Sequence, residues 1–435
     1  MAGWSHFPVA AQYLGPRAWP GWVLPAIPAG VALAVRLGYV LVAGSSGLAW
    51  GDEFVYDQLA QNILRHSCFC FVAGEESVLR PPLYPAVLAL TYAVFGHSYA
   101  AALVLQAIAG AASVYLFAII GEQVSGSPRV GMLTGWLSAV NPLLVYTTSL
   151  LYSESLYLLL LALITYGLLR LASYRRNWPV VAITTGLVWG LSLLMKPNLF
   201  PLIFALPLWG WLVLGELRRA IAVAVCVGVA VVLAVLPWSV RNLGVTGQFV
   251  LVSANAGLNM WQGNNPEADG SGLPLGRVDP LRGLSEVERD NRYMQWALDW
   301  IRADPKGFIS LVPLKVLKTL SPLETATRGS MAVSFAPLIL TGSGLYYGLT
   351  AWGMIATRPR WRKWLLIHAF IAYPILVAAV FHGGTRYGLI AQPFMGIFAA
   401  SAVLSLIPRR PFGRMMPRGT TSDPYRCPTQ RGGRG

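Results

Sequence analysis

Ten apolar segments, each about long enough to cross a lipid bilayer, follow one another along this sequence of 435 residues. They lie at residues 21–44, 98–120, 130–151, 155–172, 179–196, 198–215, 220–239, 332–356, 364–382 and 387–407. A helix of about 20 apolar residues spans the hydrocarbon core of a bilayer. A helix also satisfies its own backbone hydrogen bonds there. The pattern therefore predicts an all-α polytopic membrane protein with about ten transmembrane helices.

The composition supports this prediction, since 55% of the residues are hydrophobic, 12% are charged and the mean hydropathy is +0.55. Soluble domains carry about 25% charged residues. We expect a cytoplasmic N-terminal tail at 1–20, one membrane domain at 21–407, and a basic cytoplasmic tail at 408–435. This last tail is rich in Pro, Gly and Arg, which predicts disorder and attraction to anionic membrane lipids.

The distribution of basic residues predicts the orientation. Alternate connections, such as "RLASYRRN", "GELRR" and "RPRWRK", hold many of the 33 Lys and Arg residues and few acids. Cytoplasmic loops are basic in membrane proteins, so the net charge of +15 reflects topology and does not indicate nucleic-acid binding. Two long connections, about 45–97 and 240–331, then face the outside of the cell membrane. Their short apolar stretches, "PPLYPAVLALTYAVF" and "FISLVPLKVLKTL", predict interfacial helices.

The first outer connection contains three acids in the stretch "WGDEFVYDQLAQNILRH". Val55, Leu59 and Ile63 recur at helical spacing, which predicts an amphipathic helix that begins at the acids. Asp52 and Glu53 fit two interpretations. They are a cap and first-turn acid stabilised by the helix dipole, or one of them is a catalytic base. Asp57 is the least favoured of the three acids for catalysis.

Other polar groups lie at the predicted outer ends of helices. The acid there is Glu154, and the cations are Arg80, Lys196, Arg241 and Arg386, which Tyr387 follows. Carboxylates and cations together suit transfer of a sugar from a lipid phosphate, because cations stabilise the leaving phosphate and a carboxylate accepts the proton of the acceptor hydroxyl. Near an apolar interface, we expect the pKa of such a carboxyl to be raised.

Five further residues are candidates for contact with the sugar or the acceptor: Tyr56, Tyr84, Asn259, Trp261 and Asn264. Amides beside aromatic rings suit sugar hydroxyls, although Asn-rich segments are equally typical of turns. No histidine or cysteine pattern indicates a metal site, and His66, His97 and His382 form no motif. Because a ring closed by Cys68 and Cys70 is very small, we expect two free thiols there.

The ordered motifs "GDEFVYDQLAQNI", "RPPLYPAVLALTYAVFGHS", "NPLLVYTTSLLYSESLY", "MKPN", "LPWSVRN", "GLNMWQGNNP" and "TRYGLIAQP" resemble the GT-C superfamily of membrane glycosyltransferases. The resemblance covers about residues 30–405 and is greatest to bacterial relatives of dolichyl-phosphate-mannose protein mannosyltransferases and of the lipid A aminoarabinose transferase. It implies inverting transfer of a hexosyl or pentosyl group from a polyprenyl-phosphate donor on the extracytoplasmic face, without a catalytic metal or other cofactor.

The resemblance also implies site residues. The base maps to Asp52 or Glu53, the second acid to Glu154, and the cation before the proline pair to Arg80. Arg386 and Tyr387 map to donor-phosphate contacts. Acceptors in the superfamily include proteins, lipids and cell-envelope glycans. The rival hypothesis is a transporter or flippase of lipid-linked sugars, which predicts charges deep within the spans and two similar halves. Only Arg36 lies clearly mid-span, and no repeat is visible.

Overall fold

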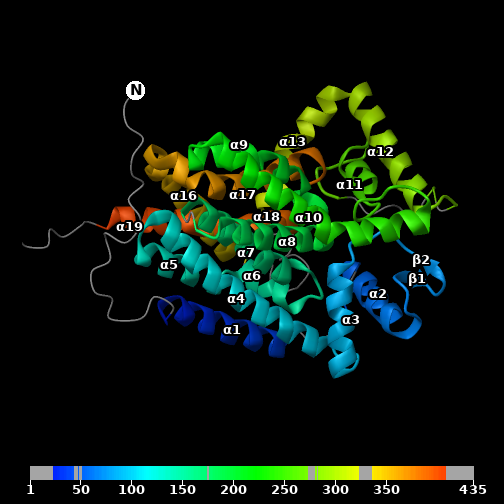
Figure 1. Cartoon of the computed structure of the whole chain (residues 1–435), viewed down its shortest axis with the longest axis horizontal. Helices are drawn as coiled ribbons and strands as arrows, with labels where there is room; N and C mark the ends of the chain where they lie inside the picture. The colour runs from blue at the N-terminus through cyan, green and yellow to red at the C-terminus, as the bar shows by residue number, and fades with distance from the viewer. Residues whose placement is uncertain are drawn as a thin grey trace, which may run out of the picture.

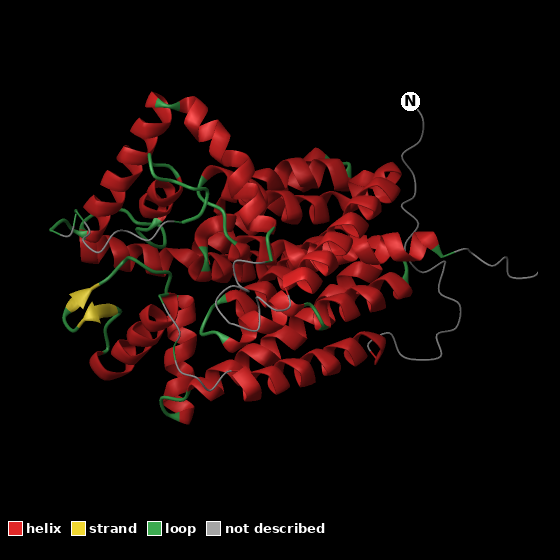
Figure 2. Ribbon diagram, turned by 180° about the vertical axis from the view of Figure 1, so that it is seen from behind, coloured by secondary structure: helices red, strands yellow, loops and turns green. Residues whose placement is uncertain are grey.

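The computed structural model describes residues 23–43, 48, 51–173, 176–272, 280–281, 283–322 and 336–407. Nearly all regular structure in these residues is helical, as Figure 2 shows. The strands described there, β1 (Cys70–Val72) and β2 (Glu75–Glu76), form one antiparallel hairpin. The all-α prediction is confirmed. The tails predicted at 1–20 and 408–435 lie outside the described residues.

The helices of the bundle run side by side along the molecule (Figure 1). They are α1 (Val23–Ala43), α4 (Tyr99–Ser125), α5 (Pro128–Ala139), α7 (Glu154–Ser173), α8 (Trp178–Met195), α9 (Leu206–Leu214), α10 (Leu217–Thr246), α16 (Ala336–Thr357), α17 (Trp361–Val380) and α19 (Gln392–Leu406). A 3₁₀ segment, η3 (Pro197–Ala205), leads into α9, and two short elements, α18 (Thr385–Gly388) and η5 (Leu389–Ala391), lead into α19. Small residues allow close packing, since a Cβ atom on Gly186 of α8 would lie 2.5 Å from the Val227 carbonyl oxygen of α10.

Eight stretches of the described chain are long and apolar enough to cross a membrane, and one of them, Leu340–Val380, comprises both α16 and α17. The eight stretches match nine of the ten predicted spans. The prediction of a continuous span at 130–151 is wrong. Helix α5 ends at Ala139, and the short helices α6 (Pro142–Tyr146) and η2 (Thr147–Ser149) follow. Pro142 ends the helix because proline restricts the residue before it, and Asn141 caps α6 by accepting the Leu143 and Leu144 amides.

Arg36 of α1 contacts the end of α5 at this interruption. Its guanidinium is buried and donates to the carbonyl oxygens of Ala139 at 3.1 Å and Ser138 at 3.3 Å, at the end of α5. A helix end leaves carbonyl groups without intrahelical partners, and in an apolar environment these groups need donors. The mid-span charge of Arg36 therefore has a structural explanation, which weakens the hypothesis of a transport pathway through it.

The exterior of the bundle is apolar where lipid would surround it. On α10, Val227 and Val231 are buried, whereas Val229 and Val232 are 55% and 57% exposed. A helix with apolar residues on both its buried and its exposed face is typical of a membrane span. The described part of the chain is therefore a multi-pass membrane protein.

The two connections predicted to face outward gather at one end of the bundle (Figure 1). The first contains α2 (Asp52–His66), the hairpin and α3 (Leu83–Phe95), and the second contains α11 (Ala256–Gly263), α12 (Glu286–Ala303) and α13 (Pro305–Leu320). The apolar stretches predicted to be interfacial form α3 and α13. Figure 1 shows α3 crossing steeply to α1 and α4, as an interfacial helix would.

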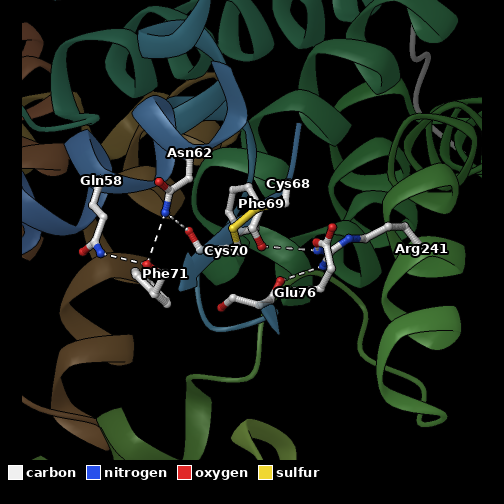
Figure 3. Close-up of a disulfide and its surroundings, with 9 residues drawn as sticks. Gln58, Asn62, Cys68, Phe69, Cys70, Phe71, Glu76 and Arg241 are labelled. Carbon is white, nitrogen blue, oxygen red and sulfur yellow. Dashed lines mark hydrogen bonds and ion pairs between the residues drawn. A yellow bond between two sulfur atoms is a disulfide. The ribbon is translucent and has the colours of Figure 1, made fainter. Parts of the chain in front are cut away.

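The prediction of two free thiols at Cys68 and Cys70 is wrong, since the structure joins them in a disulfide with a Cα–Cα distance of 5.4 Å (Figure 3). The hairpin beside it is tied to α2, because Gln58 donates to the Phe71 carbonyl at 2.8 Å and Asn62 donates to the Cys70 carbonyl at 2.7 Å. Sequence reasoning considered only the size of the ring and could not include these contacts, which hold Cys70 and Phe71 against α2.

Candidate active site

Five charged side chains from distant parts of the sequence meet at the end of the bundle that carries α2 and α3. Asp52 begins α2, Arg80 precedes α3, Glu154 begins α7, Lys196 follows α8, and Arg386 lies in α18. These five residues were all predicted site residues. The ion pairs between them show that the structure brings them together.

The pairs form one continuous chain. Asp52 accepts from Arg80 at 2.7 Å through Oδ1 and from Arg386 at 2.7 Å through Oδ2. The Nε atom of Arg386 donates to Glu154 Oε1 at 2.8 Å, and the same oxygen accepts from Lys196 Nζ at 2.9 Å. Arg386 therefore bridges the two carboxylates. Three cations against two carboxylates leave the cluster with an excess of one positive charge, which favours an anion.

Parts of this cluster are buried without a full set of partners. The Glu154 side chain is 0% exposed, yet its Oε2 atom has no hydrogen-bond partner among the described residues. The Nε atom of Arg80 is also buried and unpartnered there. Buried donors and acceptors are nearly always satisfied in folded proteins. Glu154 Oε2 and Arg80 Nε thus each keep hydrogen-bonding capacity that no described residue takes up.

Tyr152 lies directly against the charged cluster, because the guanidinium carbon of Arg386 lies 3.9 Å from the centre of its ring. This contact holds Arg386 by a cation–π interaction. Sequence reasoning missed Tyr152, although its position two residues before Glu154 was a signal.

Arg386 is positioned by glycines and by α13. A Cβ atom on Gly383 would lie 2.2 Å from the Lys315 carbonyl oxygen of α13, so only glycine fits there. Just beyond it, Thr385 donates to the Ser321 carbonyl at 2.7 Å. The "GGTRY" segment therefore packs directly on α13, and this packing directs Arg386 toward α2 and α7.

Asp52 and Glu53 are adjacent but have different surroundings. Glu53 is 3% exposed and accepts the Leu151 amide at 2.9 Å, which ties α2 to the segment before α7. The predicted N-cap is displaced, since Gly51 occupies that position with a φ of 60° and Asp52 is the first helical residue. Of the two acids, the structure places Asp52 in the ion-pair chain with the arginines and gives Glu53 a positioning contact.

The expectation of a raised carboxyl pKa does not hold for Asp52. Burial alone would raise the pKa of its carboxyl, but the charges of Arg80 and Arg386 outweigh burial and hold the pKa below its ordinary value. Asp52 is therefore ionised at neutral pH in the ligand-free site, as a base must be, and at the same time it is a weak base.

Asp57 lies one turn beyond Glu53 in a separate cluster. It is 5% exposed and accepts from Tyr92 at 2.8 Å and from Gln61 at 2.7 Å, and a ring nitrogen of His97 lies 2.8 Å from it. Tyr99 of α4 also donates to it at 3.3 Å, so these contacts fasten α2 to α3 and α4.

The structure places the predicted phosphate ligand Arg241 in a different cluster. Its guanidinium pairs with Glu76 (Figure 3). It also donates to the Ser77 carbonyl at 2.6 Å and lies 4.6 Å from the ring centre of Trp238. Arg241 therefore holds the hairpin against α10. Its sequence position, just beyond an apolar run, gave no indication of this.

Tyr387 lies next to Arg386, and its hydroxyl is 3.1 Å from His382 Nε2. Burial, together with Lys315 and Arg386, lowers the pKa of His382, so its ring is neutral at pH 7. His382, which the sequence offered only as a histidine without a metal-binding motif, is thus a neighbour of the site.

The predicted sugar or acceptor contacts are mostly enclosed. Tyr56 and Tyr84 are 5% and 1% exposed and pack edge to face at 5.0 Å, and the Tyr84 hydroxyl donates to Gln106 at 2.8 Å. Tyr56 remains a neighbour of the charged cluster, since the charge of Asp52 contributes to raising the pKa of its phenol, after burial. Tyr84 serves packing.

The remaining predicted contacts lie on or next to α11. Asn264 is fully buried and accepts from Lys315 Nζ at 2.7 Å, so it faces the protein interior. Trp261 packs against Trp296 of α12 at 5.6 Å, and Asn259 is partly exposed. No cluster of three or more His, Cys, Asp and Glu side chains that could hold a metal occurs among the described residues.

A family model described as dolichyl-phosphate-mannose-protein mannosyltransferase matches residues 79–240. That range includes Arg80, Glu154 and Lys196 of the charged cluster. A comparison with curated proteins finds no match.

Solved structures give two likenesses. ArnT from Cupriavidus metallidurans bound to undecaprenyl phosphate matches with a TM-score of 0.54 and 17% identity, over 89% of this chain and 61% of that one. The archaeal oligosaccharyltransferase AglB from Archaeoglobus fulgidus, in complex with an inhibitory peptide and a dolichol-phosphate, matches with a TM-score of 0.54 and 14% identity, over 88% of this chain and 50% of that one. This chain thus spans about half to three fifths of their lengths. Together with the family match, these likenesses confirm the resemblance noted in the sequence, and the chain has the fold of the GT-C superfamily of membrane glycosyltransferases.

Proposed function

We propose that this protein transfers a sugar from a polyprenyl-phosphate donor to an acceptor on the extracytoplasmic face of the cell membrane. The observation that carries the proposal is the chain of ion pairs in which Arg386 joins Asp52 to Glu154, with Arg80 and Lys196 at its ends. Its excess positive charge and its unpartnered Arg80 Nε suit a phosphate. The polyprenyl phosphates bound to the similar ArnT and AglB support a donor of this class.

In the proposed reaction, Asp52 accepts the proton of the acceptor hydroxyl. The hydroxyl oxygen attacks the anomeric carbon from the face opposite the phosphate, and the bond between that carbon and the phosphate oxygen breaks with its electron pair on the phosphate. This displacement inverts the anomeric configuration. Positioned proton transfer contributes about 10²–10⁴-fold to such reactions.

Cations stabilise the leaving phosphate as its negative charge grows. Arg80 and Arg386 are proposed to contact it directly, with Lys196 behind them. Glu154 contacts Arg386 and Lys196, so its proposed role is to fix their positions. Its place in the first turn of α7 is favourable for a negative charge, because a helix N-terminus carries partial positive charge.

The extracytoplasmic face is proposed because the basic connections, which are typical of the cytoplasmic side, lie at the opposite end of the bundle. The proposed acceptor is a protein, a lipid or a cell-envelope glycan. The donor sugar is a hexose or a pentose, and no metal or other cofactor is part of the proposed mechanism. Asn259 and Tyr56, which lie at or near this end of the bundle, remain proposed contacts for the sugar or the acceptor.

A substitution series tests the proposal. Purified protein in proteoliposomes is supplied with radiolabelled polyprenyl-phosphate sugars and with an envelope extract as the source of acceptors. We expect Asp52→Asn to lower transfer by about 10²-fold or more, and Glu154→Gln to lower it less. Asp299→Asn is the control, since Asp299 is an exposed acid of α12 paired with Arg302. Full transfer by both Asp52→Asn and Glu154→Gln would overturn the mechanism.

A further inference from the structure

We propose that Asp52 and the donor phosphate compete for the guanidinium groups of Arg80 and Arg386, so that donor binding releases Asp52 to act as a base. This inference rests on the proposed function and adds a regulation of the same site. In this proposal, binding of the donor controls whether Asp52 can act as a base.

The first observation is that both oxygens of the base are occupied in the ligand-free site. Arg80 donates to Oδ1 at 2.7 Å and Arg386 donates to Oδ2 at 2.7 Å. A carboxylate that accepts two charge-assisted hydrogen bonds is stabilised in its ionised form. Its tendency to remove a proton from a hydroxyl is correspondingly weak.

The second observation concerns the other contacts of the two arginines. The Nε atom of Arg386 donates to the fully buried Glu154, and this bond fixes the position of the guanidinium. The Nε of Arg80 is buried and donates to no described group. A phosphate that enters the cluster therefore meets an unsatisfied donor on the same guanidinium that holds Asp52.

The third observation is the charge balance. Glu154 already forms ion pairs with Lys196 and Arg386, so the cluster offers an incoming anion only one uncompensated positive charge. A phosphate placed on the two arginines reduces the attraction that each exerts on Asp52, whether it replaces their bonds to the carboxylate or shares them. The coupling is reciprocal, because a phosphate that raises the proton affinity of Asp52 must itself bind more weakly when Asp52 is charged.

This competition orders the reaction. Before the donor binds, Asp52 is held in two ion pairs. After the donor binds, Asp52 can accept the proton of the acceptor hydroxyl, while the arginines stabilise the leaving phosphate. The donor therefore binds first, and the acceptor is activated second.

The test measures binding of undecaprenyl phosphate to the full chain in detergent by microscale thermophoresis, together with transfer in proteoliposomes. Asp52→Asn removes the competing charge and keeps the shape of the side chain. We expect it to bind undecaprenyl phosphate about tenfold more tightly than the wild type, from the strength of one charge-assisted hydrogen bond, while transfer is lost. Asp52→Ser is a second charge-removing variant, in case the amide disturbs folding.

Glu53→Gln is the matched control, because it removes a charge one residue away, from a carboxylate that accepts the Leu151 amide. We expect it to tighten undecaprenyl phosphate binding clearly less than Asp52→Asn does, since Glu53 bonds the Leu151 amide whereas Asp52 holds both arginines at hydrogen-bond distance. Equal tightening by Glu53→Gln and Asp52→Asn would overturn the competition, because it would indicate a general field and not shared arginines.

The outcomes separate the two proposals. If Asp52→Asn and Asp52→Ser lose transfer but bind undecaprenyl phosphate no more tightly than the wild type, the competition is refuted and the assignment of the base stands. If they bind more tightly and still transfer sugar normally, the arginines are shared as inferred, but Asp52 is not the base and its release has no catalytic meaning. If the wild type does not bind undecaprenyl phosphate, both proposals fail.

Discussion

Arg386→Lys tests whether the geometry of the charged cluster matters in addition to its charge. Arg386 joins two carboxylates through separate nitrogens, with bonds of 2.7 Å to Asp52 and 2.8 Å to Glu154, and its flat face covers Tyr152 at 3.9 Å. A lysine keeps the charge, but it has a single nitrogen and no planar fork. It can therefore keep one of the two carboxylate contacts at good geometry and loses the other.

The loss of one hydrogen bond to a charged group corresponds to about 1.5–3 kcal/mol. If the full loss falls on the transition state, kcat/KM for transfer decreases by about 10- to 150-fold. The Arg386 side chain is 30% exposed, and solvent weakens its ion pairs, so the lower part of this range is expected. The assay is transfer from radiolabelled polyprenyl-phosphate sugar in proteoliposomes. The thermal unfolding of each variant is recorded in the detergent used for purification.

The control is Arg302→Lys on α12, where the arginine is 72% exposed and pairs with Asp299 at 3.0 Å. Such an exposed pair contributes little, so transfer should not change. The reasoning is refuted if Arg386→Lys folds normally and retains kcat/KM within about twofold of the wild type, since the fork geometry would then have no catalytic value.

Three further predictions follow from single features. Arg36→Met should lower the unfolding temperature markedly in differential scanning fluorimetry, because it leaves the carbonyl groups at the end of α5 without donors, at about 1–3 kcal/mol for each buried group; an unchanged unfolding temperature would refute this role. Burial lowers the pKa of Lys315 to about 8, so on raising the pH the folded state releases this proton before the unfolded state does. The free energy of unfolding of the wild type should therefore rise with pH from about 8 toward the ordinary lysine pKa, whereas that of Lys315→Met should lack this rise. Parallel curves of unfolding free energy against pH for the two proteins would contradict the prediction. Cys68 and Cys70 should resist iodoacetamide in the denatured, non-reduced protein and react after reduction, as peptide mass spectrometry can show; alkylation without reduction would disprove the disulfide.

Local patterns in the sequence predicted most of the helices. Each apolar run contains its own signal, so α1, α4, α7, α8 and α10 lie where their hydropathy indicates. The prediction of one span at 130–151 failed because the segment is apolar throughout, whereas the helix is interrupted before Pro142.

The site was predicted as a set of residues but not as an arrangement. Asp52 and Arg386 are separated by 334 positions, and only the folded chain shows that they form an ion pair. Sequence reasoning left Asp52 and Glu53 equivalent, because both are acids at one helix start. Their different partners depend on α18 and on the segment before α7, which no local pattern describes. Arg241 was misplaced for the same reason, since a cation next to an apolar run gives no information about which face it serves.

The stereochemistry of transfer tests the central claim most directly. Wild-type protein is incubated with a polyprenyl-phosphate sugar of known anomeric configuration and with the envelope extract, and the product is analysed by nuclear magnetic resonance for its anomeric configuration and by chromatography for released polyprenyl phosphate. The mechanism with Asp52 as base and the arginines at the leaving group predicts an inverted product and one polyprenyl phosphate released for each sugar transferred. A product with retained configuration, or sugar movement across the membrane without release of polyprenyl phosphate, would contradict it.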